Sequence, residues 1–311
     1  MVLTDPRRRS LDAAMLLLVV VWGVNFPIIK VAFEELPPFA FNGLRFAAAA
    51  VLLLVILRWI EGPIRLDRAD LPRLALLGLI GHAGYQTLFI GGLARTTAGH
   101  SSVILAMVPL FVGTLGVLLG LERPSLRMWT GLVLAFAGIV VLMRGRVGLT
   151  LDASTLSGDL ITLAASLCWA TYTVLSRPFL ARVSPLRLTT MTLCLGLPVI
   201  LASAVPGLLR IQWGAVSPGA WAALAFSTLF AVVVSYVIWY TSVQVAGSAR
   251  TAAFSNLIPV VALISAHLVL REPLGPPQVL GTAIVLFGVW LARSAPVPTS
   301  RTAEARAHSH A

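Results

Sequence analysis

Long apolar segments dominate this chain and restrict it to folds that sit in a lipid bilayer. A bilayer core about 30 Å thick is crossed by roughly 20 residues of helix. Ten stretches of about this length follow one another, at residues 11–32, 38–59, 71–94, 98–120, 126–144, 157–178, 184–206, 217–243, 248–270 and 276–293. Only 11% of the residues are charged and the mean hydropathy is +0.91. We therefore expect an all-α integral membrane protein with ten transmembrane helices, followed by a disordered polar tail at 294–311.

The rarer residues recur in the same order in the two halves of the chain. At an offset of 147, five pairs match: Ser10 and Ser157, Asp12 and Asp159, Trp22 and Trp169, Lys30 and Arg177, Pro38 and Pro185. At an offset of 150, four more match: Pro109 and Pro259, Glu122 and Glu272, Gly131 and Gly281, Gly138 and Gly288. We interpret these matches as a duplication, with repeats at 11–144 and 157–293. Because each repeat has five crossings, an odd number, the second would be inverted, as in many secondary transporters.

Basic residues lie between the apolar segments rather than on a separate soluble face. The net charge is +11, and Lys30 is the single lysine among 23 basic residues. Such placement favours an orientation signal over nucleic-acid binding, because the cytoplasmic flanks of membrane helices collect Lys and Arg. With the N-terminus in the cytoplasm, sixteen of the 23 basic residues lie in cytoplasmic flanks. We therefore expect both termini in the cytoplasm and the lipid bilayer, not a nucleic acid, as a partner.

Polar and aromatic side chains gather on one face of four predicted helices, which the duplication relates in pairs. They recur at the i, i+3, i+4 spacing of a helix face, as Trp22 and Asn25, His82, Tyr85 and Gln86, Trp169 and Tyr172, Tyr236 and Trp239. Polar groups are costly in lipid, and helix contacts prefer small residues. We predict that these residues, with Asn256, line a water-accessible substrate cavity. The alternative is interfacial anchoring combined with hydrogen bonds between helices.

The matched prolines and charges are candidate gating residues. Pro109 and Pro259 lie within the fourth and ninth predicted helices, where proline removes a backbone hydrogen bond and kinks the helix. We expect a pair of gating segments there, although a kink used only for packing is the alternative. Two salt bridges between the repeats are also expected, one on each side of the membrane: Lys30 with Glu272, and Arg177 with Glu122. Snorkelling and helix-end capping are the alternative.

Arg45 is a basic residue about two turns into the second predicted helix, and Thr192 is its counterpart in the other repeat. A cation at this depth has two interpretations. It can meet a substrate carboxylate, or it can pair with Glu34 or Glu35 on the adjoining loop. We favour the structural pairing with the glutamates.

Several kinds of chemistry lack their sequence signatures. The chain has no HExxH, GxSxG, CxxC or Walker A motif, and we expect no enzyme activity, metal or cofactor. No Asp or Glu falls in the middle of a predicted span, so His82 is the only candidate there for proton coupling. Facilitated diffusion requires no such group. Phosphorylated substrates would require clustered basic residues and cationic drugs a buried carboxylate, so both are weaker alternatives.

The order of these motifs resembles the EamA family of the drug/metabolite transporter superfamily. The residues that carry the resemblance are the segment Trp22-Gly23-Val24-Asn25-Phe26-Pro27 with Lys30, Pro38, Arg45, Pro109, Glu122, Gly131 and Gly138, echoed by Trp169, Pro185, Pro259, Glu272, Gly281 and Gly288. The second half departs from the pattern at Ala170-Thr171-Tyr172 and at Thr192, which predicts asymmetric substrate contacts.

This resemblance implies a ten-helix secondary transporter of small metabolites in the bacterial inner membrane, with no ATP hydrolysis. Similar bacterial members export amino acids, including aromatic ones. We therefore expect an amino-acid exporter that works by alternating access, as a monomer with a small-molecule substrate. Nucleotide sugars, phosphorylated sugars and cationic drugs stay as alternative substrates, and an intramembrane enzyme is the less favoured alternative function.

Overall fold

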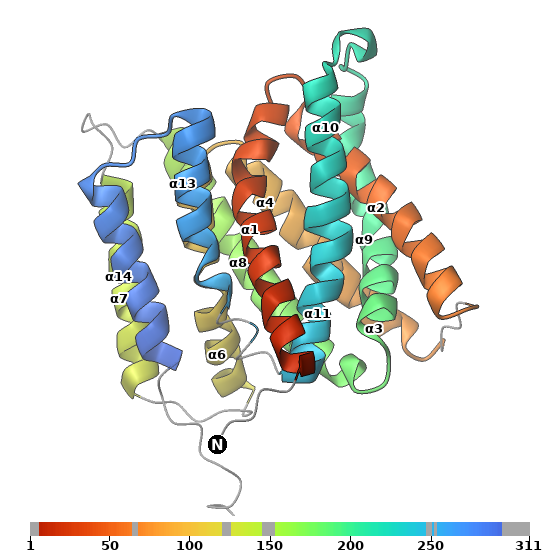
Figure 1. The fold of residues 1–311 in the computed structure, drawn as a ribbon, viewed down its shortest axis with the longest axis horizontal. Coiled ribbons are helices and arrows are strands. Elements are labelled where there is room, and N and C mark those ends of the chain that lie inside the picture. The colour runs from red at the N-terminus through yellow and green to blue at the C-terminus, as the bar shows by residue number, and fades with distance from the viewer. Residues whose placement is uncertain are drawn as a thin grey trace, which may run out of the picture.

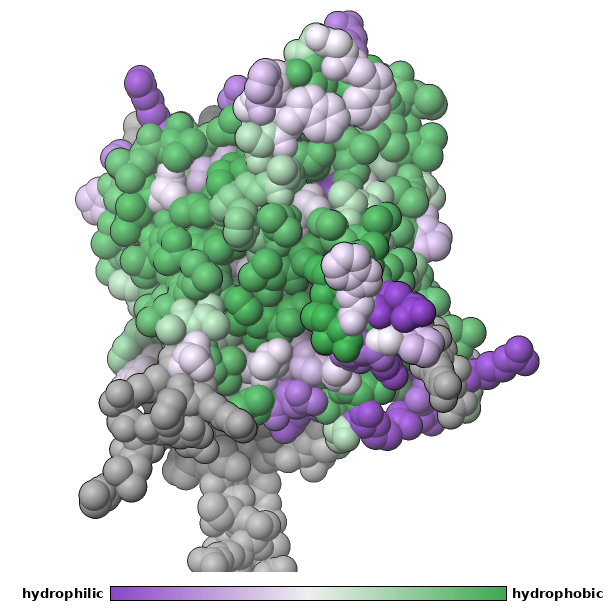
Figure 2. Space-filling model, turned by 45° about the vertical axis from the view of Figure 1, so that its right-hand side comes forward, coloured by the Kyte–Doolittle hydropathy of each residue, from purple (hydrophilic) through white to green (hydrophobic). Residues whose placement is uncertain are grey.

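Helices long and apolar enough to cross a membrane make up most of the described chain. The computed structural model describes residues 6–63, 68–119, 126–144, 153–246, 251 and 254–293. Within these ranges seven helices reach spanning length, and three shorter apolar helices are Trp129–Val141, Ile258–Leu270 and Pro276–Leu291. Figure 2 shows apolar residues across the middle of the visible face and hydrophilic residues toward its edges. The all-helical expectation is confirmed, whereas the count of ten crossings stays a prediction.

The helices follow one another along both halves of the chain. The first half contains α1 (Pro6–Ala32), α2 (Pro38–Ile60), α3 (Leu71–Gly78), α4 (Tyr85–Leu93), α5 (Ala98–Leu105), α6 (Val108–Leu118) and α7 (Leu126–Arg144). The second half contains α8 (Ala153–Leu180), α9 (Pro185–Leu208), α10 (Pro218–Phe226), α11 (Ser235–Ala246), α13 (Ile258–Leu270) and α14 (Pro276–Arg293). A short 3₁₀ helix, Trp213–Ala215, precedes α10. The predicted tail at 294–311 lies outside the described residues.

Hydroxyl caps and prolines set where several helices begin. Ser184 accepts a hydrogen bond from the Arg187 amide at 3.0 Å, and Pro185 opens α9. Ser217 likewise accepts from the Ala220 amide at 3.2 Å ahead of α10. The first amides of a helix have no partner within the helix, and a serine at the cap position supplies one. Proline tolerates the first turn because it lacks the amide that would be orphaned there.

Two long helices contain π-helical segments at corresponding places. The segment η1 (Leu79–Gly84) joins α3 to α4, and η3 (Ser227–Val234) joins α10 to α11. A π-helical turn adds a residue to the helical repeat and is frequent at functional sites. Both segments therefore change the face that the following residues present.

The matched prolines each follow a break in a membrane helix. The turn Ala106–Met107 separates α5 from α6, and Pro109 is the second residue of α6. The turn Asn256–Leu257 precedes α13, where Pro259 is again the second residue. Proline cannot donate the backbone hydrogen bond that would continue the preceding helix. The expected kinks are therefore present in both halves, as two-residue turns that interrupt the helix.

Helices of the two halves interleave in a symmetric pattern of contacts. The helix α1 packs on α13 and α11, and its counterpart α8 packs on α6 and α4. The counterparts α2 and α9 pack on each other, as do α7 and α14. Figure 1 shows α7 and α14 together at the left of the bundle and α2 with α9 at the right, with α1, α4, α8 and α11 between them. The middle of the bundle is therefore built by both halves.

The matched glycines lie where α7 and α14 approach most closely. A Cβ atom at Gly138 would lie 2.8 Å from the Gly281 carbonyl oxygen, and one at Gly288 would lie 2.6 Å from the Gly131 carbonyl oxygen. Both distances are too short for a side chain, so only glycine allows the two backbones to meet there. The recurrence of Gly138 and Gly288 thus has a packing cause.

Candidate functional site

A cavity opens between the two halves near the centre of the bundle. Seven of its lining residues were predicted from the sequence: Trp22, Asn25, Tyr85, Gln86, Trp169, Tyr236 and Trp239. The other lining residues are Phe26, Arg45, Phe89, Ser102, Leu105, Ala106, Val108, Ala231, Val232, Ser255 and Ile258. The sequence analysis weighed Arg45 as a substrate contact but favoured its pairing with Glu34 or Glu35. Helices from both halves of the chain contribute to the lining, which includes residues next to both helix breaks.

Aromatic rings form most of one wall of this cavity. The repeat-matched Trp22 and Trp169 meet edge to face with ring centroids 6.3 Å apart. Trp22 also lies 5.4 Å from Trp239 and 6.2 Å from Tyr236, and Tyr85 lies 4.8 Å from Trp169. The indole nitrogen of Trp22 donates to the Ala231 carbonyl at 2.9 Å. Rings at these separations hold one another in place, so the wall is a preformed apolar surface with few free polar groups.

Arg45 is the charged residue of the cavity lining. Its side chain is buried, with 2% of the residue exposed. One terminal nitrogen (Nη2) donates to Asn42 Oδ1 and to Gln86 Oε1, both at 2.8 Å, and the other (Nη1) donates to Ser227 Oγ at 3.2 Å. Further bonds extend this network, because Ser227 Oγ donates to Asn25 Oδ1 at 2.6 Å. The guanidinium is thus held by neutral oxygens from both halves.

The favoured pairing of Arg45 with Glu34 or Glu35 is wrong. Glu35 instead accepts hydrogen bonds from the Ser217 amide and hydroxyl, each at 2.6 Å, at the start of α10. Glu34 is exposed. The reason is tertiary: η1 and η3 bring Gln86 and Ser227 beside Arg45, and no residue in the local sequence reveals those neighbours.

Three predicted cavity residues lie outside the lining. His82 is within η1, and its Nε2 lies 3.0 Å from Thr192 Oγ1. Tyr172 bonds the same hydroxyl at 2.7 Å, and its ring covers the backbone of Gly81 so closely that a Cβ there would lie 2.2 Å from Tyr172 Cγ. The π-helical turn moves His82 off the α-helical face that the sequence spacing assumed. Both side chains pack behind the aromatic wall, so their assignment to the lining was wrong.

The third residue is Asn256, in the turn before α13. Its neighbours Ser255 and Ile258 reach the cavity, and Asn256 does not. Its Oδ1 is buried without a hydrogen-bond partner. The spacing argument treated this stretch as continuous helix, but the break before Pro259 changes which residues face inward.

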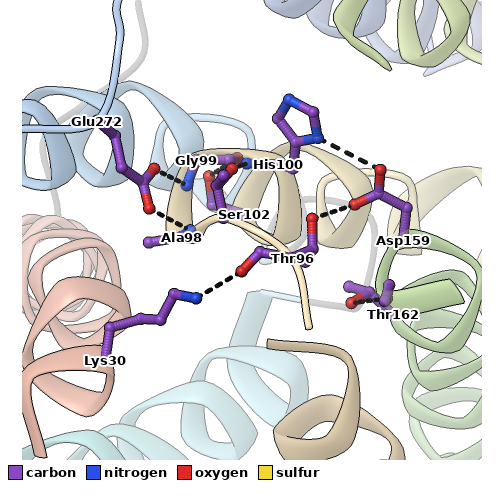
Figure 3. A network of polar contacts seen from close by, with 11 residues as sticks. Lys30, Thr96, Ala98, Gly99, His100, Ser102, Asp159, Thr162 and Glu272 are labelled. Atoms are coloured by element: carbon purple, nitrogen blue, oxygen red, sulfur yellow. Dashed lines mark hydrogen bonds and ion pairs between the residues drawn. The ribbon is translucent and has the colours of Figure 1, made fainter. Parts of the chain in front are cut away.

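A second polar cluster lies where the ends of α1 and α13 meet the start of α5. Lys30 Nζ donates to the Thr96 carbonyl at 2.6 Å, and the Glu272 carboxylate accepts from the amides of Ala98 at 2.8 Å and Gly99 at 3.0 Å. Figure 3 shows both side chains converging on this turn from opposite sides. They do not form the predicted direct salt bridge: the open amides at the start of α5 bind the carboxylate, and the Thr96 carbonyl accepts from the ammonium.

Asp159 of α8 joins the same cluster, at the right in Figure 3. It is 1% exposed, accepts a short hydrogen bond from the Thr96 hydroxyl, and lies 3.3 Å from His100 Nδ1 (Figure 3). Sequence reasoning missed Thr96 and His100, and its only available signal was the polar run at the start of the fourth predicted helix. We call Lys30, Thr96, Ala98, Gly99, His100, Asp159 and Glu272 the helix-end junction.

The structure describes only one member of the second predicted salt bridge, Arg177 with Glu122. Arg177 is exposed near the end of α8, whereas Glu122 lies outside the described residues. The Arg177–Glu122 salt bridge therefore stays a prediction.

Comparison with known proteins agrees with this architecture. The model of the EamA-like transporter family matches the chain twice, at residues 10–144 and 156–294. An uncharacterized transporter of Bacillus subtilis, YyaM, is 29% identical over 86% of this chain and 88% of its own length. An Escherichia coli protein named a probable amino-acid metabolite efflux pump is 28% identical over 89% of this chain and 92% of its own.

A solved crystal structure shows the same fold, with a TM-score of 0.65 and 18% identity over 91% of this chain and 96% of that one. The two family matches cover most of the sequence, and the resemblance seen in the motifs is thereby confirmed. The chain belongs to the EamA-like transporter family, and it is a multi-pass membrane transporter of that family.

Proposed function

We propose that this protein is a secondary transporter that exports small metabolites, and that amino acids are its substrates. The observation that carries the proposal is the cavity between the two halves, which combines an aromatic wall with a few fixed polar groups. Such a lining suits a small molecule with an apolar body and a polar end. Two relatives, from Escherichia coli and Salmonella typhimurium, are named probable amino-acid metabolite efflux pumps.

The mechanism that we propose is alternating access between two inverted five-helix repeats. The symmetric contacts of α1 with α13 and of α8 with α6 support it, as do the matched helix breaks before Pro109 and Pro259. Rocking one repeat against the other would expose the shared cavity to each side in turn. The breaks are the points at which α6 and α13 can turn independently of the segments before them.

Orientation follows from the distribution of basic residues, and both termini are assigned to the cytoplasm of a bacterial inner-membrane protein. The helix-end junction then lies on the extracellular side and acts as the closed gate. Lys30 and Glu272 hold this gate through the backbone of residues 96–99, whereas Arg177 and Glu122 form the opposite gate. We assign a monomer, because one chain supplies both halves of the cavity.

Other functions fit the cavity less well. A nucleotide sugar or phosphorylated sugar requires several basic residues, and Arg45 is the only one among the described lining residues. A cationic drug requires an acidic group, and the described part of the lining includes none. An intramembrane enzyme requires a nucleophile with a base or a metal, and the described lining offers no such pair.

Counterflow of radiolabelled amino acids into proteoliposomes holding the purified protein tests the proposal. We expect uptake of at least one amino acid, and a loss of about tenfold or more for Trp169→Ala, since aromatic contacts contribute on the order of 1 kcal/mol each. The exposed Trp221, which stacks on Trp213 away from the cavity, is the matched control, and Trp221→Ala is expected to transport normally. Uptake of another metabolite class with no amino-acid uptake would overturn the substrate assignment.

A further inference from the structure

Arg45 places a cation beside a cavity, and the lining residues that the structure describes include no carboxylate. Its Nε atom is buried without a hydrogen-bond partner, and the acceptors of its terminal nitrogens are all neutral. Within the described chain, Arg182 pairs with Asp70 and Arg187 with Glu61, and Asp159 contacts His100; none of these contacts includes Arg45. A buried charge without a counter-charge is strongly unfavourable, so such a residue usually serves a ligand or a conformational change.

The surroundings of Arg45 hold the guanidinium in one orientation. Gln86 accepts from Arg45 and in turn donates to the Tyr236 hydroxyl at 2.7 Å. The rings of Phe41 and Phe46 lie 5.6 Å and 5.1 Å from the guanidinium carbon. Aromatic faces and neutral oxygens stabilise a guanidinium without neutralising it. The group is therefore positioned in advance and keeps its full charge.

The corresponding position of the other repeat offers no second anchor. Thr192 occupies the place that matches Arg45, and its hydroxyl is used by His82, Tyr172 and the Leu188 carbonyl. Arg45 is thus the one charged group among the described lining residues, with Trp22 and Trp169 forming the apolar wall. A substrate that fits both has a single anionic end and an apolar body.

We propose that Arg45 binds the carboxylate of the transported molecule, so that the substrate class is a carboxylate metabolite with an apolar or aromatic body. This inference rests on the proposed function and narrows it. Guanidinium groups form charge-assisted hydrogen bonds with carboxylates. Nη1 of Arg45 donates to Ser227 alone and has a second N–H for the carboxylate, and the aromatic wall receives the body of the molecule. The carboxylate is required, whereas an α-ammonium group is not, since the lining supplies no acidic partner for it.

Binding of three related probes to the purified full-length protein tests this assignment. The probes are phenylalanine, 3-phenylpropionate, which lacks the ammonium group, and phenylalaninamide, which lacks the carboxylate. For the wild type we expect both acids to bind about tenfold or more tightly than the amide, because hydrogen bonds to a charged group are worth roughly a tenfold to hundredfold change in affinity. Arg45→Gln should remove this preference, mainly by weakening the acids.

Two further variants separate charge, geometry and general damage. Arg45→Lys keeps the charge but not the planar guanidinium held by Asn42, Gln86 and Ser227, so a reduced preference for the acids is expected. Arg210→Gln changes an exposed arginine just beyond α9, and its preference should equal that of the wild type. Equal binding of acids and amide by the wild type would overturn the inference without any variant, and so would an unchanged preference in Arg45→Gln.

A failure of the carboxylate site can be distinguished from a failure of the exporter proposal. A protein that binds the acids through Arg45 but shows no counterflow would overturn the transport assignment and leave the carboxylate site standing. Counterflow that is unaffected by Arg45→Gln would overturn the carboxylate site and leave transport standing. Binding of none of the three probes, together with transport of a metabolite without a carboxylate, would also overturn the site.

Discussion

The helix-end junction and the central cavity both bury charged side chains, but they surround those charges differently. In the junction, Asp159 has Thr96 and His100 as partners, and Glu272 has two backbone amides. In the cavity, Arg45 has neutral acceptors and one nitrogen without a partner. In the junction, the carboxylates have hydrogen-bond partners from the protein itself, and this arrangement is suited to closing one side of the bundle. The second region leaves a cation without a counter-charge among the described residues of a cavity lining, which is suited to an anionic ligand.

The largest effect that separates the two regions is expected for Asp159→Ala. Removing this buried carboxylate leaves Thr96 and His100 without their shared partner. Breaking a buried, hydrogen-bonded pair costs about 3 kcal/mol or more of stability. Thermal unfolding of the purified protein measures the loss, and binding of the cavity probes by the folded fraction should be unchanged.

Asp70→Ala is the matched control for Asp159→Ala. Asp70 pairs with Arg182 at 3.1 Å, but the Arg182 side chain is 55% exposed. Exposed ion pairs contribute about 0–1 kcal/mol, so this variant should unfold near the wild-type temperature. Equal losses for both variants would contradict the view that burial and complete bonding make the junction a structural closure.

A charge exchange between Lys30 and Glu272 should have the next largest effect. Because both side chains bind backbone groups of the same turn, Lys30→Glu would face the Thr96 carbonyl and Glu272→Lys would face the Ala98 and Gly99 amides. Each change sets like partial charges against each other, at a cost of about 1–3 kcal/mol. The double variant should be at least as unstable as either single variant, and recovery of wild-type stability would instead indicate a direct salt bridge.

Gln86→Ala should weaken substrate binding with a smaller loss of stability. It removes one acceptor of Arg45 and leaves Asn42 and Ser227 to hold the guanidinium. Losing the fixed orientation should lower the affinity for a carboxylate probe about tenfold. Gln244→Ala is the control, since Gln244 donates to the Leu180 carbonyl away from the cavity. A wild-type affinity in Gln86→Ala would show that the polar network does not position Arg45.

Local signals in the sequence were enough for the helices, the helix breaks and half of the site. Apolar length predicts spanning helices, proline predicts the breaks before α6 and α13, and recurring glycines mark the contact of α7 with α14. Proline and glycine affect the backbone at their own positions, and the length of an apolar helix follows from the thickness of the bilayer. The aromatic wall was predictable because Trp22 and Trp169 recur at matched positions.

The rest depended on contacts that no local pattern encodes. Arg45 meets Gln86 and Ser227, which lie 41 and 182 positions away. The π-helical segment that contains His82 shifts the helix face by a residue, which sequence spacing cannot register. The Asp159–His100 contact likewise joins residues 59 positions apart. These are the interactions that distinguish the cavity from the junction.

The smallest expected effect concerns Glu35, an exposed counterpart of the junction acids in the turn between α1 and α2. Hydrogen bonds from the Ser217 hydroxyl and then the Ser217 amide lower the pKa of Glu35 below its ordinary value of 4.5. A carboxyl group with a lowered pKa adds stability that is complete above its unfolded value and is lost as the pH falls through the folded value. The stabilising effect should therefore be present at pH 6 and fade below about pH 4.5.

Thermal unfolding of the wild type and Glu35→Gln between pH 6 and pH 3 measures this effect. The wild type should unfold at a slightly higher temperature at pH 6, and the two curves should converge toward the acidic end. The difference is expected to be small because solvent screens an exposed carboxylate far more than the buried Asp159. In the background of Ser217→Ala, which lacks the donating hydroxyl, the pH-dependent part should shrink. A difference in unfolding temperature between the wild type and Glu35→Gln that does not change with pH would show that the Ser217 contact does not depend on the charge of Glu35. Solvent exposure would then not explain why this contact differs from the helix-end junction.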